Sequence, residues 1–194
     1  MCLVSSDELL LEQPNKQEKI NIEEIIKAKG LENVLYYCPK CHQEFTISTK
    51  GNNIKCNHCR FELDILEDYH FSENEFNIRT IHDWYEFIVK YENANIDNVN
   101  LECDVEVRKF NIDNKKLDEE GSGKCFLTNK SFKFVGDLNV QEFEIDICNL
   151  RALAFSVGLE FECYYNNELY YFYPKEHRQQ CTKWALIVGE LAKG

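Results

Sequence analysis

The sequence predicts an α+β protein in which a small cysteine-containing module precedes a bent antiparallel sheet, or partly open barrel, closed by a C-terminal helix. Two Cys-x2-Cys pairs lie among short strand-like runs within residues 31–68. Six short stretches of strand-like sequence follow residue 98. An apolar stripe at helical spacing ends the chain. With 194 residues, the chain has room for one domain of ordinary size or two small ones.

The N-terminal third is expected to hold a tail and a first small unit. Residues 1–20 are polar and aperiodic, which predicts a loose tail or linker. A short helix is expected over residues 22–29, because Asn21 can cap it and Gly30 can end it. This helix and the two Cys-x2-Cys pairs together form the first predicted unit, residues 21–68.

A second helix is predicted from about Ile81 to Glu92. Its apolar side chains recur at positions i, i+3, i+4, i+7 and i+8, and Thr80 can cap it. We assign this helix and the β region after it to a second domain, residues 79–194. That length is enough for a hydrophobic core of its own, so this domain is expected to fold without the first unit.

The apolar pattern changes from a period of 3.6 to a period of 2 after this helix. Strands are expected at residues 99–107, 124–128, 132–135, 140–145, 159–164 and 169–173. The pairs Asn129-Lys130 and Asn166-Asn167 are typical of hairpin turns. Residues 118–120 are interpreted as an acidic turn, and residues 121–124 as a flexible turn that enters a strand.

The last helix is expected to begin at Pro174, because proline suits the first turn of a helix. Its predicted apolar stripe consists of His177, Cys181, Trp184, Val188 and Leu191. A histidine on such a stripe is usually a hydrogen-bonded core residue, so we interpret His177 in that way.

Composition excludes several classes of function. Charged residues make up 29% of the chain, and 34 acidic against 22 basic side chains give a formal net charge of −12. Nucleic-acid binding and tight adhesion to anionic membranes both need surplus cations, so we expect neither. The longest mostly apolar stretch, residues 150–159, is too short for a transmembrane helix, which takes about 20 residues. The first residues lack the basic segment of a signal peptide, so we predict a cytoplasmic protein with reduced cysteines.

The two Cys-x2-Cys pairs are separated by 14 residues and predict a metal site. Two thiolates two residues apart can reach one cation, and two such turns complete a tetrahedron. The predicted ligands of one structural Zn²⁺ per chain are Cys38, Cys41, Cys56 and Cys59. Four protein ligands leave no open position for water or substrate, so neither His42 nor His58 is needed. The alternative is a set of redox-active cysteines or a chance pairing.

No catalytic constellation stands out in the sequence. No serine or cysteine lies in a nucleophile elbow, and no histidine is placed beside an obvious acid partner. The remaining cysteines are isolated, and most lie on apolar faces, where a thiol acts as a small hydrophobic side chain. We therefore predict no catalytic residue and no enzymatic activity for this chain alone.

Several stretches resemble a known family. The run GLENVLYYCPKC at residues 30–41 is similar to the start of the zinc ribbon that follows the catalytic domain in clostridial-type 1-acyl-glycerol-3-phosphate acyltransferases. DWYEF at residues 83–87, GSG at 121–123 and YYFYP at 170–174 resemble the extension after that ribbon. The strand order and the run at residues 121–129 also resemble GRAM or pleckstrin-homology-like domains, some of which bind membrane lipids.

The catalytic domain of that family has no counterpart in this sequence. The family carries a catalytic His-x4-Asp motif and a Gly-Thr-Arg segment, and neither occurs here. The residues five positions after the histidines are Ile47, Leu63, Glu75, Phe87 and Thr182. The resemblance therefore implies only the four zinc ligands, together with a pleckstrin-homology or GRAM-like sheet.

Two functional hypotheses follow. The first is a non-catalytic accessory or regulatory module of a bacterial phospholipid-synthesis acyltransferase, acting in cis or in trans, with at most weak contact with the inner face of the membrane. The second is a stand-alone interaction module whose protein partner is unrelated to lipids. Lys124, Lys130 and Lys133 form a small positive cluster that could contact a lipid headgroup, or could simply line a solvated strand edge.

Overall fold

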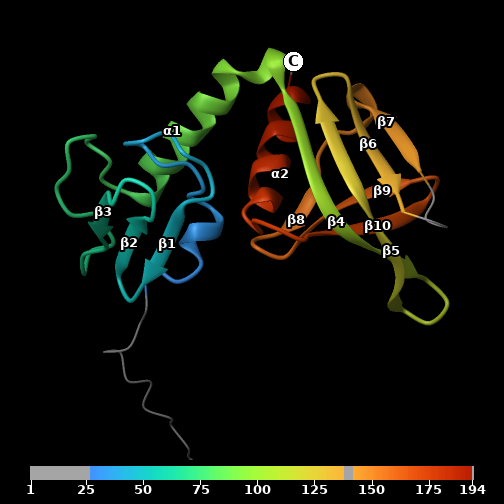
Figure 1. Cartoon of the computed structure of the whole chain (residues 1–194), viewed down its shortest axis with the longest axis horizontal. Helices are drawn as coiled ribbons and strands as arrows, with labels where there is room; N and C mark the ends of the chain where they lie inside the picture. Colours follow the sequence, from blue (N-terminus) through green and yellow to red (C-terminus); the bar gives the residue numbers. More distant parts are fainter. Residues whose placement is uncertain (1–26, 138–141, 194) are drawn as a thin grey trace, which may run out of the picture.

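The computed structural model describes residues 27–137 and 142–193 (Figure 1). The predicted tail at residues 1–20 and most of the helix expected at 22–29 lie outside the described residues, and residues 27–30 form turns. The described chain folds into an N-terminal unit, which we define as residues 27–80, and a C-terminal unit, residues 95–193. Helix α1 lies between them in sequence, and the figure shows the two units side by side.

The N-terminal unit is built on a small antiparallel sheet with strand order β1-β2-β3. Its elements are the 3-10 turn η2 (Leu31–Asn33), β1 (Ile47–Lys50), β2 (Asn53–Cys56) and β3 (Glu62–Asp64). The remaining residues form loops around this sheet. One of them returns through an antiparallel bridge between Ile65 and Phe71.

Helix α1 (Ile81–Ala94) begins where the sequence predicts, at a capping box. The Thr80 hydroxyl accepts a 3.1 Å hydrogen bond from the Asp83 backbone N–H. The Asp83 carboxylate in turn accepts one of 2.9 Å from the Thr80 backbone N–H. The predicted cap at Thr80 is therefore confirmed.

The C-terminal unit is a curled, half-barrel antiparallel sheet of seven strands with a C-terminal helix. The strand order is β7-β6-β5-β4-β10-β9-β8. The strands are β4 (Asn100–Asn111), β5 (Lys116–Thr128), β6 (Ser131–Gly136), β7 (Phe143–Asp146), β8 (Ala154–Ser156), β9 (Glu160–Tyr165) and β10 (Glu168–Pro174). The 3-10 turns η3 (Ile96–Asn98) and η4 (Ile147–Asn149) precede β4 and β8, and α2 spans Gln180–Leu191. The predicted α+β class, bent sheet and closing helix are confirmed.

Strand β5 corrects the prediction that residues 118–124 form turns. The stretches predicted as turns, residues 118–120 and 121–124, both belong to β5 and run alongside β4. The pairing register shifts between Val107 and Arg108. A Cβ added at Gly123 would lie only 2.5 Å from the Phe134 ring, so this glycine allows strand β6 to approach closely. Gly121 has a φ of 139°, which suits the bulge beside it. The two glycines therefore lie within a strand, although a glycine-rich sequence of this kind is typical of a turn.

The start of the last helix also differs from the prediction. Pro174 is the final residue of β10, where it pairs with Val105, and α2 begins six residues later at Gln180. His177 consequently lies outside the helix and is exposed. It stacks on Phe45 of the N-terminal unit, with ring centroids 5.0 Å apart. The interpretation of His177 as a core residue on the helical stripe was wrong.

The C-terminal core lies between the inner face of the sheet and α2. The rings of Phe161 and Trp184 stack with centroids 5.2 Å apart, and both side chains are buried. Phe132 and Phe172 pack edge to face beside them. Cys103, Cys125, Cys163 and Cys181 are buried in the same cluster, as expected for small hydrophobic side chains. This core draws only on residues of the C-terminal unit.

Helix α1 buries its apolar face in the other unit. Trp84 and Ile88 are fully buried in one cluster with Tyr36 and Tyr37. The Trp84 indole N–H donates a 2.9 Å hydrogen bond to the Tyr37 carbonyl oxygen. The prediction grouped this helix with residues 79–194, but its packing joins it to the N-terminal unit. Leu186 of α2 belongs to the same cluster.

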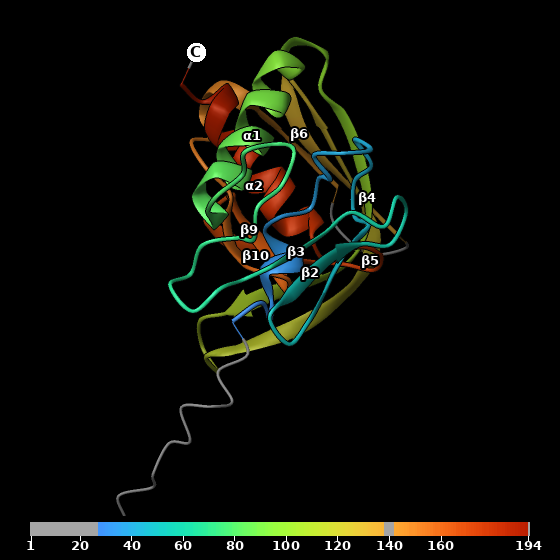
Figure 2. The same cartoon turned by 90° about the vertical axis from the view of Figure 1, so that its left-hand side faces the viewer.

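The two units meet along α2, as Figure 2 shows from the side of the N-terminal unit. Thr182 donates a 2.7 Å hydrogen bond from its hydroxyl to the carbonyl oxygen of Asn33. Lys183 is buried and pairs with Glu44 and with Glu92 of α1. Tyr36 completes this network with a 2.9 Å hydrogen bond to Glu92. These contacts join α2 to the N-terminal unit and to α1.

Candidate metal centre

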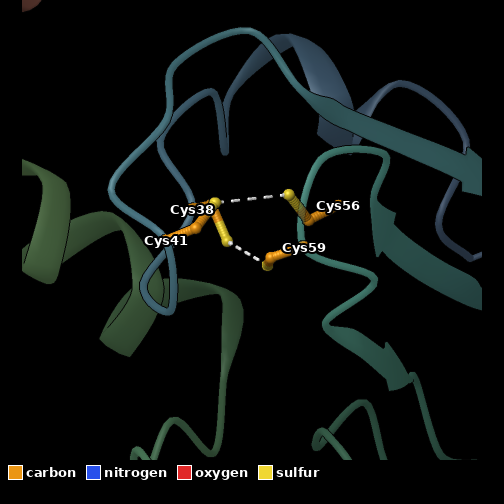
Figure 3. Close-up of side chains that lie close together, drawn as sticks. All are labelled: Cys38, Cys41, Cys56 and Cys59. Carbon is orange, nitrogen blue, oxygen red and sulfur yellow. Dashed lines mark hydrogen bonds between the residues drawn. The ribbon is translucent and has the colours of Figure 1, made fainter.

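The four predicted ligands lie together where two turns of the N-terminal unit face each other (Figure 3). Their Sγ atoms all lie within 4.8 Å of one another. Cys38 and Cys59 have Sγ atoms 3.7 Å apart, as do Cys41 and Cys56. These distances are too long for disulfides, whose S–S bond is about 2.05 Å. The four cysteines could therefore hold one metal ion.

Two similar turns position the sulfurs. The N–H of His42 donates to the carbonyl of Cys38, and the N–H of Arg60 donates to that of Cys56, both at 3.0 Å. His42 and Arg60, each directly after the second cysteine of its pair, have φ values of 61° and 66°. The left-handed residue lets each turn close and return the chain to the sheet. The two residues between the cysteines of each pair thus form the same kind of turn twice, which gives two thiol pairs of similar geometry.

Hydrogen bonds in the two turns prepare the sulfurs for negative charge. Burial raises the pKa of Cys38 and of Cys41. Burial also opposes ionisation of Cys56, but the backbone N–H of Cys59 and the Thr46 hydroxyl outweigh it and lower the pKa of Cys56 to about 6. The Thr46 hydroxyl oxygen lies 3.3 Å from the Cys56 Sγ. A bound cation would favour the thiolate forms of Cys38 and Cys41.

The site is closed on one side and accessible on the other. Cys38 and Cys56 are buried, while Cys41 and Cys59 are partly exposed. An ion could therefore enter from solvent and still be held against the core. The cluster contains neither His42 nor His58. The His42 ring instead lies 2.8 Å, Nδ1 to hydroxyl, from Tyr37.

Sequence reasoning missed the residues that connect the site with the rest of the molecule. Glu44 and Phe45 follow the first turn directly, and they contact Lys183 and His177 of the C-terminal unit. Thr46 is also absent from the predicted site, although its hydroxyl contacts a sulfur. A threonine near a Cys-x2-Cys pair is too common a pattern to have indicated this role. The contact partners lie more than 130 residues apart, beyond the reach of local patterns.

The three predicted lipid-contact lysines lie on β5, on β6 and in the turn between them. Lys124 pairs with Glu102 at 3.4 Å and with Asp104 at 3.9 Å. Lys133 is exposed and lies opposite Glu144 of β7 in the strand register. Lys130 is exposed in the β5–β6 turn. Acidic neighbours thus offset part of this positive charge, and the headgroup contact stays a prediction.

A groove of 670 Å³ separates the β4–β5 hairpin from the β9–β10 hairpin. Its carboxylates have polar partners: Asp118 accepts a hydrogen bond from Asn111, and Glu168 pairs with Lys109. The hydrogen bond from Tyr170 and the pairing with Lys109 lower the pKa of Glu168. An acid held ionised in this way is poorly suited to donate a proton. Its lining residues include no cysteine, serine or histidine.

Comparison with models of known protein families finds no match to this chain, and comparison with curated proteins finds none. Within the part of the chain that the structure describes, no helix is long and apolar enough to cross a membrane.

Proposed function

We propose that Cys38, Cys41, Cys56 and Cys59 bind one structural Zn²⁺ and that residues 27–80 form a zinc ribbon. The sulfur spacing carries this proposal. Zn–S bonds of about 2.3 Å give a regular tetrahedron with edges of about 3.8 Å. Two of the edges between these Sγ atoms measure 3.7 Å. Four thiolates also match the preference of Zn²⁺ for soft ligands in a closed structural site.

The proposed ion would add stability to a unit whose sheet is small. The three-stranded sheet has strands of only three or four residues. Units this small usually need a metal or disulfides, and a structural Zn²⁺ contributes on the order of 10 kcal/mol. Amide and hydroxyl donors around the sulfurs would spread the negative charge of the thiolates. The metal supplies folding energy in this proposal and takes part in no reaction.

The whole chain, in this proposal, is a non-catalytic accessory module that binds a protein. Its C-terminal half-barrel would correspond to a pleckstrin-homology or GRAM-like domain, with the curled sheet and closing helix in support. The partner that the sequence resemblance suggests is a 1-acyl-glycerol-3-phosphate acyltransferase of phospholipid synthesis. An interaction module with a partner unrelated to lipids is the alternative. The pairing of Lys124 with two carboxylates favours this alternative. These carboxylates offset part of the positive charge of the three-lysine cluster that was predicted to contact lipid.

A binding experiment distinguishes the two roles. The zinc-loaded full chain is titrated onto a purified bacterial 1-acyl-glycerol-3-phosphate acyltransferase, while its acyl transfer is followed. The accessory role predicts saturable binding and altered turnover, with no acyl transfer by the chain alone. Absence of binding contradicts the acyltransferase partner and leaves the zinc proposal intact, because metal content is measured separately. Acyl transfer by the repurified chain alone would overturn the non-catalytic role.

A further inference from the structure

The four edge strands of the two sheets differ in how they are protected. Unpaired strand edges invite pairing with other chains, and proteins commonly protect them with charged side chains. Three of the described edges follow this rule at their exposed positions: Lys50 on β1, Glu62 and Asp64 on β3, and Glu144 and Asp146 on β7. All three residues of β8, Ala154–Ser156, are exposed, and none is charged. Strand β8 is therefore the one edge among the described strands that carries no charged side chain, and only its shortness limits pairing.

The sequence around β8 is apolar as well as uncharged. Residues 152–159 contain no ionisable side chain. Phe155, Val157 and Leu159 are 40%, 51% and 47% exposed, which makes them three of the large hydrophobic residues that the fold leaves in solvent. Phe155 pairs with the buried Phe161 of β9, so the inner side of this edge continues the apolar face of the sheet. An added strand would need apolar side chains on this side.

The outer side of the same edge combines two small residues with two neighbouring glutamates on β9. Ala154 lies opposite Glu162 in the register, and Ser156 lies opposite Glu160. Glu160 is only 4% exposed, and its Oε2 has no hydrogen-bond partner among the described residues. Burial and the neighbouring Glu160 raise the pKa of Glu162. Two glutamates thus lie side by side on this face, and Arg108 lies two strands away in the row of Glu162 and Tyr171.

We propose that β8 binds an extended segment of a partner protein in which apolar and basic residues alternate, as an eighth strand of the sheet. Backbone hydrogen bonds to β8 would provide affinity, and the alternating side chains would provide specificity. The apolar residues would cover Phe155 and Val157. The basic residues would extend over Ala154 and Ser156 toward Glu162. This surface is separate from the metal site and does not depend on the proposed function.

The distances are compatible with such a contact. Neighbouring strands lie about 4.8 Å apart, so an added strand would lie roughly 10 Å from β9, two strand spacings away. A lysine side chain and a glutamate side chain can bridge that distance when only alanine or serine lies between them. A large residue at position 154 or 156 would block the path.

Charge argues for a different protein and against a second copy of this chain. Each copy carries a formal charge of −12, so two copies repel each other. Symmetric pairing of β8 with itself would also bring Phe155 and its neighbours together without supplying a cation to Glu160 or Glu162. A basic segment would be attracted by the net negative charge of the chain, and its cations could pair with the glutamates of β9.

The test uses the zinc-loaded full chain and an acetylated, amidated hexapeptide that alternates lysine and valine. Two control peptides alternate glutamate and valine, or place three lysines before three valines. The chain variants are Ala154→Lys and Glu162→Gln. Glu144→Gln, on the protected edge β7, is the matched control. Titration calorimetry gives the affinities, and amide exchange of the unmodified chain shows where the peptide binds.

The proposal predicts that the alternating lysine peptide binds and protects amides of residues 153–157. Ala154→Lys should weaken binding at least about tenfold by placing like charges together. Glu162→Gln should weaken it about threefold, as expected for one cross-strand charge pair, and Glu144→Gln should leave it unchanged. Melting curves confirm that each variant is folded, and the exchange result in the unmodified chain needs no variant.

Several results would overturn the proposal. These are no binding up to about 1 mM peptide, equal binding of either control peptide, or protection at β7 in place of β8. A fourth is self-association of the chain that Ala154→Lys abolishes, which would show that the edge binds a second copy.

Discussion

The N-terminal and C-terminal units differ in whether their cores draw on residues outside the unit. The C-terminal unit closes a seven-stranded sheet around its own helix, and Phe161, Phe172 and Trp184 pack within it. The N-terminal unit has strands of three or four residues and borrows Trp84 and Ile88 from α1 and Leu186 from α2. The difference shows that a long sheet can complete its own core, whereas the core around the short sheet extends onto α1 and α2.

The largest expected effect is a loss of amide protection on removal of the metal, in the N-terminal unit but not in the C-terminal unit. Cys59→Ser should abolish stoichiometric zinc and expose the amides of the N-terminal unit to exchange, because the proposed Zn²⁺ would contribute on the order of 10 kcal/mol. The buried strands β4 and β10 should keep their protection. Hydrogen exchange with mass spectrometry makes the measurement, and Cys148→Ser, an exposed cysteine outside the cluster, is the control. Equal loss of protection in both units would contradict the comparison.

The second prediction concerns independent folding. A fragment of residues 95–194 should keep a cooperative thermal transition in the presence of a chelator, because its core draws on no residue outside it. A fragment that begins at residue 79 should bind more of a hydrophobic dye, because Trp84 and Ile88 of α1 lose their partners. Calorimetry and dye fluorescence compare the two. A shorter fragment without a transition would show that the N-terminal unit is needed to complete the C-terminal core.

The third prediction concerns the contact between the units. Lys183→Met should destabilise the chain by roughly 3 kcal/mol, because it leaves the buried Glu92 and the adjacent Glu44 without their cation. Lys193→Met removes an exposed pair with Glu190 and should cost less than about 1 kcal/mol. Urea unfolding of both variants provides the comparison. Similar losses would mean that the buried network adds nothing to the contact.

The same network predicts a dependence of stability on pH. Burial raises the pKa of Glu92 above its ordinary value of 4.5, although Lys183 and Tyr36 act against this. The folded chain therefore binds this proton more tightly than the unfolded chain, and stability falls as pH rises from about 4.5 through the raised pKa. Glu92→Gln should remove this component of the slope. An unchanged slope in the urea-derived free energies would assign the effect to other groups.

The smallest expected effect concerns the three lysines. Co-sedimentation with anionic liposomes at physiological salt should be weak, because each exposed lysine adds only about 1 kcal/mol and the chain carries −12. Changing Lys124, Lys130 and Lys133 together to glutamate should therefore alter little. Strong sedimentation that this triple change abolishes would make lipid binding the main role of the C-terminal unit.

Local patterns predicted the parts of the structure that local interactions determine. The Thr80 capping box, the Asn166-Asn167 turn and the cysteine spacing each depend on a few adjacent residues, and each was located correctly. The asparagines have φ values of 49° and 65°, as a two-residue hairpin turn requires. The cysteine spacing alone was enough to identify the four groups that the fold brings together.

The missed features depend on tertiary contacts. The glycines of β5 resemble a turn in sequence, and only the approach of Phe134 explains Gly123 inside a strand. Pro174 can start a helix or end a strand, and pairing of β10 with β4 decides between them. Strand β8 has three residues, too few for an alternating pattern to emerge. The Lys183 network joins residues far apart in sequence, so no local pattern could indicate it.

The central claim is that four thiolates hold one Zn²⁺ in the N-terminal unit, and X-ray absorption at the zinc edge tests it most directly. Protein purified without chelator should contain one zinc per chain, with a single shell of four sulfurs at about 2.3 Å. Cys148→Ser should give the same spectrum, and Cys59→Ser should not. Zinc below a few tenths per chain, or a shell that includes nitrogen or oxygen ligands, would contradict the account.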